Sequence, residues 1–87
     1  MAGERGQLSA DRLVYMANQI ALFFRSQPTS DVVAATADHL HKFWEPRMRR
    51  QIVDLLANGK AAGLADVARE AVLKLPEAAG AAGDRQP

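Results

Sequence analysis

The sequence predicts a small all-α protein, a bundle of four helices with short connections and flexible termini. At 87 residues the chain has the size of one small domain, because single domains mostly hold about 50–200 residues. Nowhere do polar and apolar residues alternate with the period of two that a strand requires. We therefore expect one helical domain over residues 9–75, preceded by a flexible arm over 1–8 and followed by a disordered tail over 76–87.

The first helix is expected from Ala10 to Arg25. Ser9 is a suitable N-cap, because its hydroxyl can accept a hydrogen bond from a backbone N–H of the first turn. The helix must end before Pro28, which cannot continue it. Apolar residues recur at the helical spacing and form one inward stripe: Leu13, Met16, Ala17, Ile20 and Phe24.

The opposite side of this helix is also apolar. Tyr15 and Leu22 project from it, seven residues apart, with Asn18 and Gln19 near them. A surface helix is normally polar on its outer side. The two apolar side chains are therefore either a strip that faces a partner or scattered surface residues, which are common.

The second helix starts after Thr29 or Ser30, either of which can cap it, and runs to Trp44. The residue before a proline avoids the helical conformation, so Glu45 should separate the second helix from the third. Pro46 suits the first position of the third helix, where no backbone N–H is needed. The inward residues expected on the second helix are Val33, Ala37 and Leu40.

The third helix ends at Asn58-Gly59, a helix-stop signal. The fourth spans about Leu64 to Leu75 and is closed by Pro76. Inward residues expected on the third helix are Met48, Ile52, Leu55 and Leu56. Those expected on the fourth are Leu64, Val67, Ala68, Ala71, Val72 and Leu75.

The residue types give little support for catalysis. The chain has no cysteine, which excludes disulfides, thiolate catalysis and cysteine ligation of iron–sulfur clusters by this chain. His39 and His41 are two residues apart, so they point to nearly opposite sides of a helix rather than toward one metal. Gly59-Lys60 lacks the other residues of a phosphate-binding loop. We expect no catalytic, cofactor-binding or metal-binding residue here.

Charge and hydropathy predict the compartment of the chain and the class of its partner. Its 11 Lys and Arg nearly balance 10 Asp and Glu, which argues against a general polyanion binder. The N-terminal segment lacks the apolar core of a signal peptide. The longest apolar run is far shorter than the roughly 20 residues that span a bilayer. We expect a cytoplasmic protein whose partner is neither nucleic acid nor a membrane.

The stretch HKFWEPRMRR, residues 41–50, concentrates aromatic and basic side chains. On a helical wheel Arg47 and Arg50 share the outer face with Asp54, while Arg49 lies on a flank, within reach of Trp44 for a cation–π contact. Three interpretations stay open: a solvated face, a nucleic-acid contact or a protein-docking site. Trp44 itself falls on the inward stripe, which favours a core or corner residue.

Three segments carry a family resemblance: MANQIALFF (16–24), HLHKFWEPRMRRQI (39–52) and GLADVAREAV (63–72). Together they resemble the delta subunit of molybdenum-containing, NAD-dependent formate dehydrogenases, over about Leu13 to Leu75. The resemblance implies a non-catalytic chain of a large cytoplasmic complex. In such a complex an alpha subunit holds the molybdenum cofactor and iron–sulfur clusters, and other subunits carry FMN and the NAD site.

The sequence and the resemblance together predict an accessory subunit that acts by binding protein, with the alpha subunit as its expected partner. It would support either the stability of the complex or the insertion of its cofactor. The alternative is a small helical nucleic-acid-binding protein that uses Arg47, Arg49 and Arg50. The predicted partner-binding residues are Tyr15, Asn18, Gln19, Leu22, Trp44, Arg47, Arg49 and Arg50.

Overall fold

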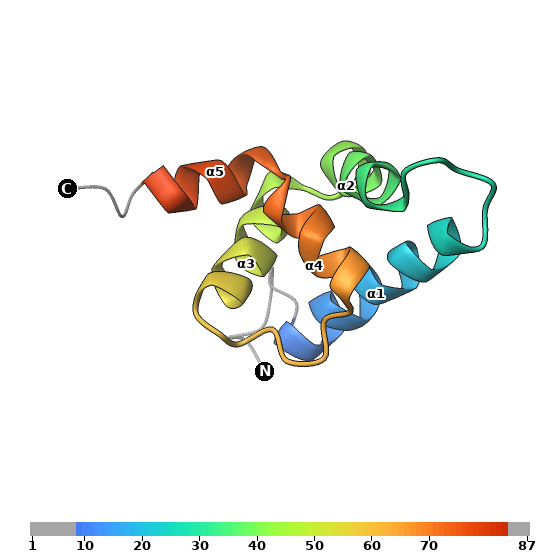
Figure 1. Ribbon diagram of the computed structural model, residues 1–87. Coiled ribbons are helices and arrows are strands. Elements are labelled where there is room, and N and C mark those ends of the chain that lie inside the picture. The colour runs from blue at the N-terminus through green and yellow to red at the C-terminus, as the bar shows by residue number, and fades with distance from the viewer. Residues whose placement is uncertain (1–8, 84–87) are drawn as a thin grey trace.

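The computed structural model describes the backbone of residues 9–83 and the side chains of residues 9–79. These residues form helices and no strand, so the all-α prediction is confirmed (Figure 1). The helices are α1 (Ala10–Arg25), α2 (Val32–Phe43), α3 (Pro46–Ala57), α4 (Asp66–Leu73) and α5 (Pro76–Gly83).

The C-terminal end differs from the prediction. Residues 76–83 form α5, where the composition predicted a disordered tail. Pro76 takes the first helical position, and alanine, the best helix former, fills half of the helix. The Pro, Gly and Ala content was therefore misread as disorder. The remaining parts of the predicted arm and tail, residues 1–8 and 84–87, lie outside the described residues.

The helices α1 and α2 each begin directly after a residue whose side chain caps the helix. Ser9 Oγ accepts from Arg12 N at 3.1 Å, as predicted. Asp31 is the N-cap of α2, and its side chain accepts a hydrogen bond from Ala34 N at 3.0 Å. An aspartate cap also places a negative charge at the positive end of the helix dipole. The predicted caps one or two residues earlier, Thr29 and Ser30, are not used.

The corner between α2 and α3 has the geometry that the sequence predicts. Trp44 and Glu45 are both extended, with ψ of 140° and 150°, and Pro46 opens α3. The second helix thus ends one residue before Trp44. At the other end of α3, Gly59 adopts a φ of +71°, which ends the helix as expected and which a glycine tolerates best.

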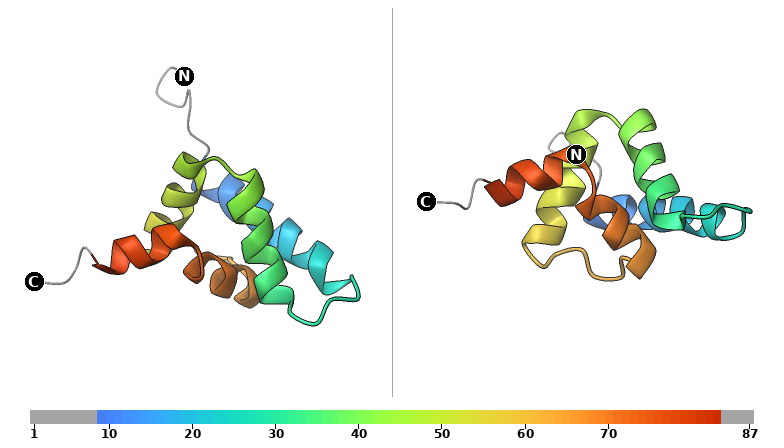
Figure 2. Two further views of the ribbon diagram at one scale, coloured as in Figure 1. Left: turned by 90° about the horizontal axis from the view of Figure 1, so that it is seen from above. Right: turned by 45° about the horizontal axis from the view of Figure 1, so that its top comes forward.

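The core lies where α1, α2, α3 and α4 meet. In Figure 2, α5 extends away from this group on the side opposite the α1–α2 connection. Leucine or isoleucine side chains from three helices are fully buried, each contributing roughly 1.5–3 kcal/mol. The inward stripes predicted for α2 and α4 are confirmed, whereas the sequence prediction missed buried positions on three helices: Val14, Ala21, Thr36 and Val53.

Candidate protein-docking surface

The outward face of α1 exposes large apolar side chains. Tyr15 is 63% exposed and Leu22 is 58% exposed, as the helical spacing predicts. Gln19 lies between them and is also exposed. Phe23, which the sequence analysis missed as a surface residue, is 55% exposed and widens the same face. Among the described residues, α1 thus presents three large apolar groups to solvent within nine positions.

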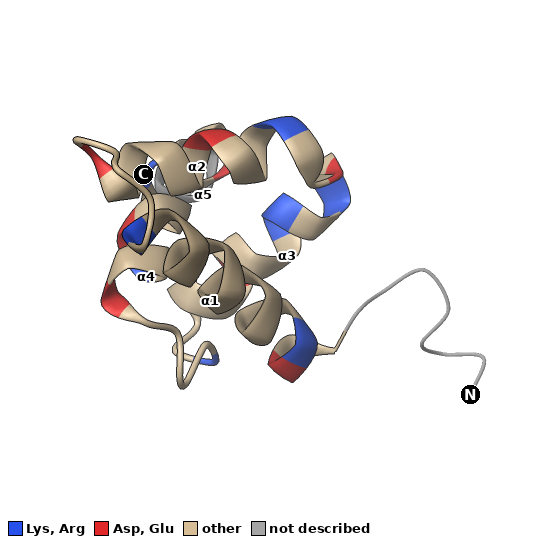
Figure 3. Cartoon of the chain, turned by 90° about the vertical axis from the view of Figure 1, so that its right-hand side faces the viewer, with Lys and Arg blue, Asp and Glu red and all other residues tan. Residues whose placement is uncertain are grey.

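Charged residues occur only near the two ends of α1. Asp11 and Arg12 stand at its start and Arg25 at its end, and the twelve residues between Arg12 and Arg25 include no Asp, Glu, Lys or Arg (Figure 3). A helix whose outer face meets only water normally carries charge along that face. This uncharged, partly apolar face is therefore suited to contact another protein.

Asn18 serves the chain's own fold. Its amide nitrogen donates to the carbonyl of Gly63 at 2.9 Å, and its amide oxygen accepts from the N–H of Ala65 at 2.8 Å. Ala65 is the N-cap of α4 and supplies no side-chain cap, so Asn18 takes up one of the backbone N–H groups there. Asn18 thus anchors the α3–α4 connection to α1, and its role as a contact residue stays a prediction.

A groove of about 300 Å³ lies between α1 and the start of α4. Leu22 and Gln19 form part of one wall, and Ala65 and Asp66 form part of the other. Arg25, near the end of α1, also lines the groove. The groove thus adjoins the exposed face of α1 and adds a recess into which a partner side chain can fit.

An aromatic cluster continues from α1 onto α2. The ring of Phe23 meets Phe24 edge-on with centroids 5.1 Å apart, and Phe24 meets His39 at 5.9 Å. His39 in turn lies 4.7 Å from Phe43, which is largely exposed. No single-helix pattern predicts this cluster, because it joins residues from two helices. It gives His39 an aromatic packing role.

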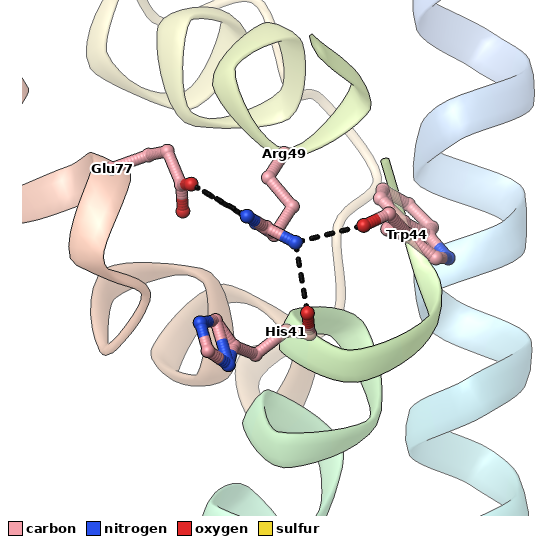
Figure 4. Close-up of polar contacts among 4 residues, drawn as sticks. All are labelled: His41, Trp44, Arg49 and Glu77. Atoms are coloured by element: carbon pink, nitrogen blue, oxygen red, sulfur yellow. Dashed lines mark hydrogen bonds and ion pairs between the residues drawn. The ribbon is translucent and has the colours of Figure 1, made fainter. Parts of the chain in front are cut away.

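Arg49 joins three segments at the α2–α3 corner (Figure 4). Its Nη1 donates to the carbonyls of His41 and Trp44, each at 2.8 Å. Its Nε donates to Glu77 Oε2 at 3.0 Å, and Nη2 lies 3.0 Å from the same oxygen. A cation that binds the last carbonyls of α2 also interacts favourably with the negative end of that helix.

Trp44 is buried, with 6% of its surface exposed. Its indole ring turns toward α1 and away from Arg49, which reaches only the Trp44 carbonyl (Figure 4). The cation–π contact considered from the sequence is therefore replaced by a hydrogen bond to the backbone. Trp44 is a core residue in the isolated chain, as its place on the inward stripe predicts, and its role in partner binding stays a prediction.

The charge of Glu77 is set by its surroundings. Burial by itself raises the pKa of the Glu77 carboxyl. The backbone N–H of Glu77 and the guanidinium of Arg49, with a further contribution from His41, outweigh burial and hold that pKa below its ordinary value. Oε1 of the same carboxylate is buried without a hydrogen-bond partner among the described residues. The carboxylate is therefore stabilised by its own backbone N–H and by Arg49.

The predicted arginine cluster is divided by the fold. Arg47 and Arg50 are exposed, whereas the Arg49 side chain is only 11% exposed and is engaged with Glu77. Arg49 is therefore not available for a nucleic-acid contact that needs all three guanidinium groups. Among the predicted contact residues, those that remain on the surface are Tyr15, Gln19, Leu22, Arg47 and Arg50.

A match to one protein family establishes which proteins the chain is related to. A family model described as NADH-dependant formate dehydrogenase delta subunit FdsD matches residues 12–72. The chain belongs to this family. The match to the delta-subunit family runs from the first turn of α1 almost to the end of α4, and it confirms the resemblance drawn from the sequence. No curated protein and no solved structure matches the chain.

Two further features of the described residues bear on function. None of their His, Asp and Glu side chains gather in groups of three or more that would suit a metal ion. None of the helices in this part of the chain has the length and apolar character needed to cross a membrane.

Proposed function

We propose that this chain is a non-catalytic accessory subunit of a cytoplasmic, NAD-dependent formate dehydrogenase complex. The observation that carries the proposal is the match of residues 12–72 to the delta-subunit family. The chain acts by binding protein, and its first partner is the alpha subunit. Through this contact it supports the stability of the complex or the insertion of the molybdenum cofactor.

The partner subunits carry the chemistry in this proposal. Formate oxidation by a molybdenum enzyme and electron transfer to NAD require the molybdenum cofactor, iron–sulfur clusters and FMN, which the resemblance assigns to other subunits. Iron–sulfur clusters are held mainly by cysteine thiolates, and this chain has no cysteine. Three of the titratable side chains described above have structural partners: Arg49 and Glu77 pair with one another, and His39 packs between Phe24 and Phe43.

The outward face of α1 is the proposed docking surface. Tyr15, Leu22 and Phe23 are exposed there, and each apolar side chain of this size stabilises a complex by up to roughly 1.5–3 kcal/mol when it is fully buried. Arg47 and Arg50, exposed on α3, provide a second, basic contact in the proposal. Charges at the rim of an interface mainly direct the encounter and set its orientation.

Co-purification tests the proposal. The full chain, tagged and produced together with the formate dehydrogenase subunits, is expected to retain the alpha subunit through washes in moderate salt. Removing the chain is expected to lower the amount of assembled, cofactor-loaded enzyme while the remaining enzyme keeps its Michaelis constant for formate. Recovery of the tagged chain without any formate dehydrogenase subunit would overturn the proposal, as would turnover of formate by the isolated chain.

A further inference from the structure

The C-terminal helix α5 rests on the remaining helices through its first turn. Its backbone comes close to α3 and α4, but within the described residues it approaches neither α1 nor α2. Glu77 and Ala78 are partly sheltered there, whereas Pro76 and Ala79 on either side of them are exposed. From that turn α5 runs away from the α1–α4 core (Figure 2). Its attachment to the core therefore depends on few residues.

The apolar part of this attachment is small. Ala78 packs against the core cluster, but a buried alanine removes far less apolar surface from water than the leucine and isoleucine side chains of α1–α4. A helix of eight residues is too short to be stable alone in water, and Gly80 lowers its helix propensity further. We therefore expect α5 to separate from the core at a lower free energy than unfolding of the whole chain requires.

The polar part of the attachment is the ion pair between Glu77 and Arg49, and its geometry is incomplete. A guanidinium and a carboxylate pair best when two N–H groups meet two different oxygens in parallel. Here Nε and Nη2 of Arg49 both meet Oε2 of Glu77 at 3.0 Å, and Oε1 is buried without a hydrogen-bond partner within the described residues. A carboxylate that offered both oxygens to the guanidinium would bind it better than Glu77 does.

Arg49 is held in place independently of α5. Its Nη1 donates to the carbonyls of His41 and Trp44, so the guanidinium keeps its position when Glu77 leaves. Val53 lies one helical turn further along the same side of α3 and is buried, at 5% exposure. Without α5 this side of α3, which we call the Arg49 face, would present a positioned guanidinium next to apolar surface.

Two further observations connect the Arg49 face with partner binding. Arg47 and Arg50 are exposed on the same helix, so an acidic segment that reaches Arg49 also meets their positive charge. The match to the delta-subunit family covers residues 12–72. Arg49 thus lies within the matched residues, whereas Glu77 and the whole of α5 lie beyond them.

We propose that α5 is a detachable cover of the Arg49 face: it separates from α3 at the junction of Leu75 and Pro76 while α1–α4 stay folded, and a carboxylate-bearing segment of the partner subunit then replaces Glu77 on Arg49. In the isolated chain Glu77 neutralises the guanidinium, since a mostly buried charge without a partner is unfavourable. This inference rests on the proposed function, because the partner subunit supplies the carboxylate.

Hydrogen exchange of the isolated full chain, followed by mass spectrometry, tests whether α5 opens separately. Ala79→Gly lowers helix propensity at an exposed position and should speed amide exchange in residues 80–83 about fivefold, with the amides of α1 and α4 unchanged. Glu77→Gln should speed it more. The control is Ala34→Gly, the same change at an exposed position of α2, which should leave α5 unaffected. Exchange of α5 only together with α1 and α4 would overturn the cover.

Quantitative pull-down of the formate dehydrogenase subunits tests whether the cover masks a binding face. When only the open form binds, the apparent Kd falls in proportion to the open fraction. Ala79→Gly should therefore bind about fivefold more tightly and Glu77→Gln more tightly still, while Ala34→Gly binds as the native chain does. In the native complex, α5 should exchange faster than in the isolated chain. Unchanged or weaker binding of both loosened variants, or slower exchange of α5 in the complex, would overturn the masked face.

Arg49→Lys in the Ala79→Gly background tests the carboxylate. Lysine keeps the charge but cannot make the two-point contact of a guanidinium, so binding per open fraction, with the open fraction taken from hydrogen exchange, should fall about tenfold. Circular dichroism verifies that the variant is folded. Undiminished binding of the folded variant would overturn the carboxylate contact. Failure of the proposed function is a separate result, because then not even the native chain would retain a formate dehydrogenase subunit.

Discussion

Arg49 and Glu77 join α3 to α5 across 28 residues of sequence, with Nε and Nη2 of the arginine each 3.0 Å from Oε2 of the glutamate. Both side chains are mostly shielded from water, at 11% and 15% exposure. The same guanidinium holds the last carbonyls of α2. One arginine thus ties the C-terminal helix to the α2–α3 corner.

Glu77→Gln is expected to lower the free energy of unfolding by about 1–3 kcal/mol, because charge-assisted hydrogen bonds to Arg49 are replaced by weaker neutral ones. Arg49→Met should cost more, since it also leaves the carbonyls of His41 and Trp44 without their donor. Urea unfolding measures both. The control is Glu70→Gln on the exposed side of α4; if it destabilises the chain as much as Glu77→Gln, the pair contributes nothing specific.

The Arg49–Glu77 pair is also expected to respond to acid. The pKa of Glu77 in the folded chain lies below its ordinary value of 4.5, so the folded state favours the ionised form. The resulting stabilisation is complete above the unfolded pKa and is lost as the pH falls through the folded pKa. The difference in unfolding free energy between the native chain and Glu77→Gln should therefore be constant above about pH 5.5 and shrink below about pH 4.5. A difference that does not change between pH 6 and pH 3 would contradict this assignment.

Asn18→Ala is expected to destabilise the chain by about 1–3 kcal/mol, because it removes hydrogen bonds to both Gly63 and Ala65. Asn18→Asp keeps an acceptor for the N–H of Ala65 but loses the donor to Gly63, so its cost should depend on pH. Thermal unfolding of the isolated chain measures the loss. Gln19→Ala, one position along the same helix and exposed, is the control. If Asn18→Ala has full stability but does not bind, the side chain is a contact residue after all.

The sequence predicts those features of a helix that depend only on residues within it or next to it. Ser9 caps α1, the break before Pro46 separates α2 from α3, and Gly59 ends α3, because caps and breaks depend on neighbouring residues. The contacts of Asn18 and Arg49 could not be predicted in the same way. Gly63 and Ala65 lie 45 and 47 residues from Asn18, and Glu77 lies 28 residues from Arg49. A helical wheel contains no information about which loop or helix covers a polar side chain.

For the candidate docking surface, too, the sequence predicts which way a side chain faces but not which residues of other helices surround it. The wheel identifies Tyr15 and Leu22 as outward-facing, and both are exposed. It assigns Trp44 correctly to the inward stripe, yet the cluster of Arg and Trp side chains suggested a contact site because composition alone cannot tell a surface patch from a buried corner. Phe43 was missed because its neighbours His39 and Phe24 belong to an aromatic cluster assembled from two helices.

Arg47→Glu together with Arg50→Glu is expected to weaken association with the partner subunit about tenfold, because exposed interfacial charges contribute modestly and their reversal adds repulsion. Helical content should hardly change, since both residues are on the exposed side of α3. Pull-down at two salt concentrations measures the effect, which should be smaller in high salt. Lys60→Glu with Lys74→Glu is the charge-matched control. Unchanged binding of the Arg47 and Arg50 variant would make these arginines an ordinary solvated face.

The outward face of α1 gives the sharpest prediction. Tyr15→Ser with Leu22→Ser removes two large apolar groups that are 63% and 58% exposed in the isolated chain. Because they are already in water there, the melting temperature should hardly change, as is usual for surface substitutions, which mostly stay within about 0.5 kcal/mol. In the complex both groups are expected to be buried. Their loss should then weaken binding by on the order of 3 kcal/mol, about a hundredfold in Kd.

Leu73→Ser provides the matched control for this variant, because Leu73 is also a large apolar residue, 60% exposed, on α4 rather than α1. It should bind normally. Calorimetry of the isolated chains and quantitative pull-down of the complex together separate the possible results. If the Tyr15 and Leu22 variant unfolds, the two side chains belong to the core despite their exposure. If it folds and binds as well as Leu73→Ser, they are scattered surface residues, and the partner docks on another face of the bundle.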